Sequence, residues 1–129
     1  MKNPNPDMLL RIAQGDAYGA ACEYLRFPYD RAIQESALRF MGYLAHPTHV
    51  DHRPGRYTDD TQMSIAVAEV MLDGLRQVHE TARLQFADAF VRAFRRDRRK
   101  GYSGRFQAFL ESDAAATGHG FLRNVHPDS

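Results

Sequence analysis

A hydroxyl and two neighbouring carboxylates, those of Thr58, Asp59 and Asp60, are the strongest candidates for chemistry in this sequence. They stand where a loop gives way to the largely apolar run of residues 63–75, a pattern typical of a helix that is buried on most sides. Carboxylates are costly to bring close to such a core unless a partner compensates their charge. Two kinds of partner fit the sequence: backbone N–H groups and a metal ion.

The first interpretation is a helix cap. Thr58 or Asp59 at the N-cap position would accept hydrogen bonds from N–H groups of the first turn, and Asp59 and Gln62 have the spacing of a capping box. Acidic residues also suit the positive end of the helix dipole. Taken alone, the pattern favours this interpretation, because acidic residues are common at helix starts.

The second interpretation is a hard divalent cation. Magnesium and manganese prefer oxygen ligands held in fixed directions, and Thr58, Asp59 and Asp60 would bracket one or two such ions. The helix dipole opposes a cation at this end of a helix. A metal site here therefore needs further carboxylates from elsewhere in the chain.

A second motif lies upstream at residues 15–23, which read Gly-Asp-Ala-Tyr-Gly-Ala-Ala-Cys-Glu. With Gly-Arg-Tyr-Thr-Asp-Asp-Thr-Gln-Met at residues 55–63, it resembles the signatures of the ADP-ribosylglycohydrolase family. Cys22 stands where many relatives carry proline or another small residue. Two motifs in the family's order, at about the family's separation, are far more specific than either alone. The resemblance therefore favours the metal site over the cap.

The resemblance spans residues 9–109 or so and implies a compact all-α fold with a two-magnesium centre, or its manganese equivalent, at the mouth of a cleft. Thr58, Asp59 and Asp60 would be the metal ligands, and Glu23 would be the acidic residue at the reacting centre. The implied activity is hydrolysis of the glycosidic bond between ADP-ribose and an acceptor. The implied substrate is an ADP-ribosylated protein or a small molecule that contains ADP-ribose. The alternative is a non-catalytic helical relative with a binding or structural role.

Two further elements of the family pattern, a glycine-rich substrate loop and a late acidic motif, are missing from the sequence. We therefore expect residues 1–129 to be the N-terminal portion of a single all-helical glycohydrolase domain, either a fragment or a degenerate copy. Such a portion would carry only part of the metal site. It would bind metal weakly and would expose apolar surface that the other portion covers.

Hydrophobic periodicity predicts the elements that position these residues. It indicates helices over residues 7–23, 81–95 and 103–110, and a short helix or irregular packed segment over residues 30–43. Residues from 113 onward lose the periodicity. Because no segment alternates like a strand, the predicted fold class is all-α. Asp16 belongs to the first helix and has no assigned role.

Composition sets the broad class. Charged residues at 26% and hydrophobic residues at 43% are ordinary for a globular protein, and a net charge of +1 gives no general attraction to nucleic acid or membrane. The lone Cys22 excludes an internal disulfide and favours a reducing compartment. The sequence also has no apolar run typical of a secretion signal or a membrane span. We therefore expect a cytoplasmic protein without a nucleic-acid or membrane partner.

Two clusters each allow a functional and a structural interpretation. His46, His49 and His52 recur at a spacing of three and invite a zinc site, but no cysteine accompanies them, so an exposed polar loop is favoured. The basic residues 95–100 are typical either of a nucleic-acid contact or of a helix C-terminus. The near-neutral net charge favours the helix end.

Overall fold

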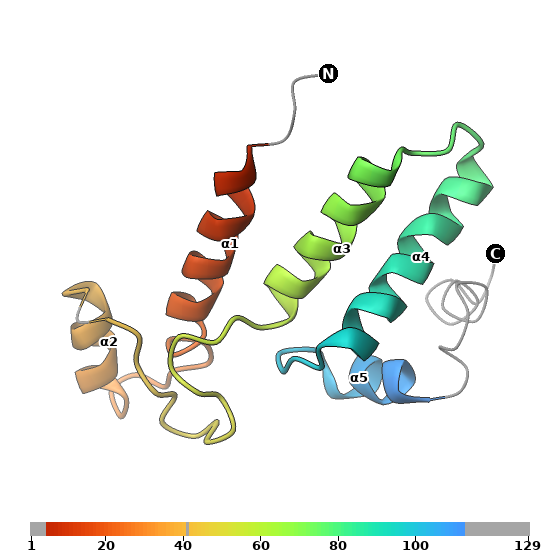
Figure 1. Cartoon of the computed structure of the whole chain (residues 1–129). Helices are drawn as coiled ribbons and strands as arrows, with labels where there is room; N and C mark the ends of the chain where they lie inside the picture. Colours follow the sequence, from red (N-terminus) through yellow and green to blue (C-terminus); the bar gives the residue numbers. More distant parts are fainter. Residues whose placement is uncertain (1–4, 41, 113–129) are drawn as a thin grey trace. The chain divides into compact units, whose positions relative to one another are not determined.

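A computed structural model describes residues 5–40 and 42–112, which form five α-helices and no strand (Figure 1). The predicted all-α fold class is therefore confirmed. The loss of periodicity predicted from residue 113 onward lies outside the described residues. The chain divides into two compact units, Met1–Thr61 and Gln62–Ser129. Within the described part of the chain, no helix is both long and apolar enough to cross a membrane.

The first unit contains α1 (Pro6–Gly19) and α2 (Arg31–Leu38). Asn5 caps α1, since its side chain accepts a hydrogen bond of 3.0 Å from the backbone N–H of Asp7. Pro6 occupies the start of the helix, where its missing N–H is not needed. Helix α1 thus starts one residue before the predicted boundary.

The prediction that the first helix reaches Glu23 is wrong. Helix α1 ends at Gly19. The N–H of Cys22 then donates a 2.7 Å hydrogen bond to the carbonyl of Gly19, so the chain forms a tight turn there and the helix does not continue. Glycine is a poor helix former, and the turn buries Ala20 and Ala21. Glu23 therefore lies in the turn that follows α1, outside the helix that carries Asp16.

Buried polar side chains, rather than large apolar ones, characterise the first unit. Its buried apolar residues in the described range are Ala17, Ala20 and Ala21. Three polar residues are buried as well: His46, Thr58 and Thr61. A tyrosine joins the two helices, because the Tyr18 hydroxyl donates to the carbonyl of Ala37. Hydrogen bonds of such buried groups are costly to break, so they hold this unit together.

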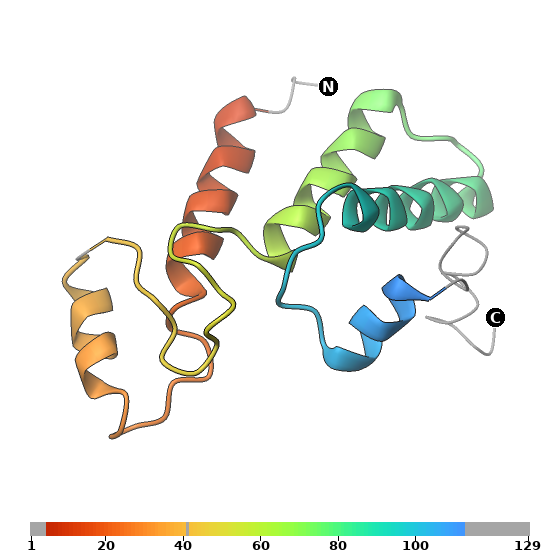
Figure 2. The same ribbon diagram turned by 60° about the horizontal axis from the view of Figure 1, so that its bottom comes forward.

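The second unit contains most of α3 (Asp59–Asp73), together with α4 (His79–Arg96) and α5 (Gly104–Glu111). Helices α3 and α4 lie side by side in both views (Figures 1 and 2). Small residues allow this approach, since Ala66 and Val70 of α3 pack with Ala89 and Ala93 of α4. A second cluster joins α4 to α5 and is built from Ala87, Val91, Phe94, Tyr102, Phe109 and Leu110.

Helix α3 is buried on one face only, so the prediction of burial on most sides is wrong. Ala66 and Val70 face the core, whereas Val67 is 38%, Met71 45% and Leu72 70% exposed. An apolar run alone does not reveal how many sides of a helix its neighbours cover.

The basic cluster ends α4, as predicted. The helix stops at Arg96, which pairs with Glu69 of α3 at 2.7 Å. Arg99 pairs with Asp97 at 2.6 Å, and the Arg98 guanidinium lies 5.8 Å from the centroid of the Phe94 ring. These contacts join α4 to its neighbours and stack one cation on the core.

The predicted capping box between Asp59 and Gln62 is absent. Gln62 is 3% exposed, and its side-chain amide donates to the carbonyl of Ala93 at 3.1 Å and to that of Asp97. Its side-chain oxygen accepts a 2.7 Å hydrogen bond from the Tyr102 hydroxyl. Gln62 therefore links the start of α3 to the end of α4 instead of capping its own helix.

We expect Gln62→Leu to lower the free energy of unfolding by about 2–3 kcal/mol, because it removes the buried hydrogen bonds that the Gln62 side chain makes with the Tyr102 hydroxyl and with the carbonyls of Ala93 and Asp97. Tyr102→Phe removes one donor, and its expected cost is about 1 kcal/mol. Urea unfolding followed by circular dichroism measures both. Gln14→Leu on the exposed side of α1 is the control. A loss for Gln62→Leu no larger than that for Gln14→Leu would contradict the bridging role.

Candidate functional site

Asp16 joins the two sequence motifs. Its carboxylate accepts hydrogen bonds from the N–H and the hydroxyl of Thr58, at 2.8 and 2.6 Å. It also accepts them from the N–H and the hydroxyl of Thr61, at 3.1 and 2.5 Å. All of these groups belong to the first unit. A single side chain of the first motif thus binds the segment that opens the second motif.

This contact supplies the cap of α3. N–H groups at a helix start need an outside acceptor, and Asp16, 42 residues before Thr58, accepts two of them. The Thr58 hydroxyl donates a hydrogen bond to Asp16, so the acceptor at this helix start is a residue that the cap interpretation did not name. A hydroxyl whose proton is engaged keeps its lone pairs for another donor or for a ligand.

The hydrogen bonds also set the charge state of Asp16. Burial alone raises the pKa of this carboxyl, but the side-chain and backbone bonds from Thr58 and Thr61 outweigh burial and hold the pKa below its ordinary value. Asp16 is therefore a stable carboxylate, and it remains the acceptor for both threonines at neutral pH.

Glu23 lies within electrostatic range of the carboxylates at the start of α3. Glu23 is exposed, but partial desolvation still raises the pKa of its carboxyl, and the negative charges of Asp60, Asp59 and Asp16 raise it further, while His46 acts in the opposite sense. Burial likewise raises the pKa of Asp59, against a bond from its own backbone N–H, and the charge of Asp60 adds to the rise. The fold therefore concentrates negative charge from both motifs in one region of the first unit.

The chemistry of this region fits a divalent cation. All the candidate donors are hard oxygen atoms of the kind that magnesium prefers, and the mutual repulsion among the carboxylates is what a bound cation relieves. Across residues 5–40 and 42–112, however, no group of three or more His, Cys, Asp or Glu side chains is already arranged to hold an ion. The metal-ligand roles of Thr58, Asp59 and Asp60 accordingly remain predictions.

His46 is buried, so the prediction of an exposed histidine loop is wrong at this position. It is 5% exposed, and its Nε2 lies 2.7 Å from the carbonyl oxygen of Glu23. Its Nδ1 accepts bonds from the N–H groups of Thr48 at 3.1 Å and His49 at 2.9 Å. Because Nδ1 accepts, the ring proton is on Nε2 and is donated to Glu23. His49 stacks on His46 at 4.2 Å and is exposed, as predicted.

The family model described as ADP-ribosylglycohydrolase matches residues 7–127. This chain belongs to the ADP-ribosylglycohydrolase family. Comparison with curated proteins and with solved structures gave no match. Family membership confirms the resemblance carried by the two motifs, and with it the glycohydrolase type of the chain.

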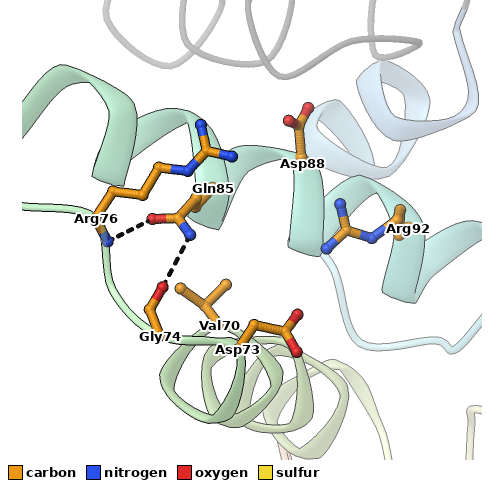
Figure 3. A pocket seen from close by; sticks show the side chains of 7 residues that line it. All are labelled: Val70, Asp73, Gly74, Arg76, Gln85, Asp88 and Arg92. Carbon is orange, nitrogen blue, oxygen red and sulfur yellow. Dashed lines mark hydrogen bonds between the residues drawn. The ribbon is translucent and has the colours of Figure 1, made fainter.

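A hollow of about 480 Å³ lies in the second unit of this ADP-ribosylglycohydrolase family member (Figure 3). Gln85 forms part of its wall and accepts a 2.9 Å bond from the N–H of Arg76 while donating at 3.1 Å to the carbonyl of Gly74. The remaining lining residues are Val70, Asp73, Asp88 and Arg92. Two carboxylates and two guanidiniums balance one another, and none of the predicted site residues contributes to this hollow.

Sequence reasoning missed two residues that organise the candidate site. Asp16 lies inside the first motif. Its carboxylate, in a segment that contains several small residues, was the one feature of the sequence that could have indicated its role. His46 had no such signal, since its spacing to the other histidines pointed to a zinc site or an exposed loop. Its contact with Glu23 joins positions 23 residues apart and exists only in the folded chain.

Proposed function

We propose that this chain carries the N-terminal half of a site that hydrolyses the glycosidic bond joining ADP-ribose to an acceptor, on an ADP-ribosylated protein or a small molecule. The supporting observation is the contact of Asp16 with Thr58 and Thr61, which unites the two family motifs. In this arrangement Glu23 shares one region of negative charge with Asp59 and Asp60. The reducing environment favoured by the lone Cys22 makes the cytoplasm the proposed location.

In the proposed mechanism Thr58, Asp59 and Asp60 would hold one or two magnesium ions. Bound magnesium would supply Lewis-acid chemistry at this site. Asp16 fixes the Thr58 hydroxyl by accepting its hydrogen bond, which directs the oxygen lone pairs away from that bond. Asp16 is a positioning residue in this scheme.

Glu23 acts as the proton acceptor in the proposed reaction. Burial and the neighbouring carboxylates raise its pKa, and a general base is most effective when its pKa approaches the working pH. Glu23 takes the proton of the attacking water while the water oxygen bonds to the anomeric carbon. The bond from that carbon to the acceptor breaks, and the acceptor leaves with the proton that Glu23 took from the water. The surrounding carboxylates stabilise the positive charge that develops on the sugar.

The test is release of free ADP-ribose from peptides ADP-ribosylated on arginine or serine, measured by chromatography. We expect release with magnesium or manganese, loss of release on chelation with EDTA, and recovery when magnesium is added back. No release from any of these substrates, or from ADP-ribosyl small molecules, at saturating magnesium would contradict the proposal.

A non-catalytic, ADP-ribose-binding role is the second candidate. It is favoured by the finding that the described residues contain no preassembled group of three metal-binding side chains. Calorimetry separates the two functions. A binding module takes up ADP-ribose without metal and releases none from a modified peptide, whereas the hydrolase requires magnesium for turnover.

A further inference from the structure

We infer that His46 is a positioning residue for Glu23: the His46 imidazole holds the Glu23 backbone and thereby sets where the Glu23 carboxylate lies in the first unit. The catalytic meaning of this inference rests on the proposed function, whereas the structural meaning does not.

The hydrogen bonds of His46 are the first support. Its ring is buried and uses both nitrogens: Nε2 donates to the Glu23 carbonyl at 2.7 Å, and Nδ1 accepts from the loop N–H groups of Thr48 and His49. A buried imidazole with both nitrogens engaged is fixed in orientation and tautomer. The His46 ring therefore connects the loop at Thr48 and His49 to the main chain at Glu23.

The backbone beyond α1 is the second support. Glu23 lies past the last helical residue, and the next residue, Tyr24, has φ 53°. A non-glycine residue in the left-handed region persists only where its surroundings fix it. The contact from His46 reaches the carbonyl directly before this residue, and the Tyr24 ring lies 6.3 Å from that of His49.

The third support is that the same loop is held at its other end. Thr58 bonds to Asp16, at the beginning of the first motif, and His46 bonds to Glu23, at its end. Residues 46–58 are therefore tied at both ends to the segment of residues 16–23. These two ties together fix where the Glu23 backbone lies relative to the start of α3.

A pair of substitutions separates the two functions of the ring. The amide nitrogen of glutamine reaches about as far as Nε2, so His46→Gln keeps a donor for the Glu23 carbonyl. The amide oxygen of asparagine corresponds to Nδ1, so His46→Asn keeps an acceptor for the loop but does not reach Glu23. Both variants remove the imidazole, so any electrostatic effect of the ring itself is the same in the pair.

The first measurement is the pKa of the Glu23 carboxyl, followed by carbon-13 NMR in the metal-free chain. We expect a raised pKa in the wild type and in His46→Gln, and a pKa close to the ordinary glutamate value in His46→Asn. Thermal unfolding of both variants accompanies the titration. A raised Glu23 pKa in folded His46→Asn would overturn the inference, as would an equal fall in both variants.

The second measurement is steady-state release of ADP-ribose. We expect His46→Asn to lower kcat by about 10–100-fold, because a misplaced reacting group costs rate more than binding. KM and the magnesium midpoint should stay within about twofold, and His46→Gln should keep kcat within about threefold. Equal losses in both variants would indicate loop stability alone. If the wild type releases no ADP-ribose, the proposed function fails, while the NMR comparison still decides the role of His46.

Discussion

In a protein that carries the complete site, the double substitution Asp59→Asn and Asp60→Asn is expected to reduce magnesium-dependent release of ADP-ribose by about 10³-fold or more, since loss of one electrostatic group at a reacting centre already costs about 10²–10³. Both residues open α3 and belong to the charged region that includes Glu23. Amides keep the size of the side chains but remove the negative charges that would hold a cation. Steady-state release over a range of magnesium concentrations measures the effect.

The matched control is Asp73→Asn at the opposite end of the same helix, where the carboxylate is exposed. We expect turnover in this control within about twofold of the wild type. The double variant loses favourable charge at the helix start, worth about 0.3–1 kcal/mol for each residue, so its folding is checked by circular dichroism. Wild-type turnover in a folded double variant would remove Asp59 and Asp60 from the proposed site.

Asp16→Ala should produce the largest loss of stability in the first unit, about 3 kcal/mol. One carboxylate there accepts four hydrogen bonds from Thr58 and Thr61, and bonds to a charged group contribute about 1.5–3 kcal/mol each without being additive. Both threonines are buried, so water does not readily replace the lost acceptor. Urea unfolding of the variant and the wild type measures the difference.

A double-mutant cycle with Thr61→Val tests the origin of this loss. Valine has the shape of threonine but lacks the hydroxyl that donates to Asp16 at 2.5 Å. We expect a coupling energy of about 1–2 kcal/mol between the two positions. Gln14→Ala, on the exposed side of the same helix, should change stability by no more than about 0.5 kcal/mol. Additive effects of Asp16→Ala and Thr61→Val would show that their contact contributes little.

Local pattern was enough to predict most of the helices. Helices α4 and α5 lie within two residues of their predicted bounds because their apolar residues repeat at the helical period. The end of α1 was missed, since it depends on a turn that buries Ala20 and Ala21 after Gly19. The exposed side of α3 was missed because an apolar run does not state which neighbours are available to cover it.

For the candidate site as well, the sequence predicted some features and not others. The two motifs identified Glu23, Thr58, Asp59 and Asp60 as the residues of interest, and family membership supports that choice. The contact that brings the motifs together joins Asp16 to positions more than forty residues later. No helical or strand periodicity relates positions so far apart, so this contact and that of His46 became visible only in the folded chain.

The dependence of the α3 start on Asp16 has a consequence for inheritance. A substitution of Asp16 alone would disturb the structure of the downstream motif, even with every residue of that motif unchanged. Substitutions in the two motifs are therefore expected to occur together during evolution. A relative that lacks Asp16 should carry a compensating substitution at the position of Thr58 or Thr61.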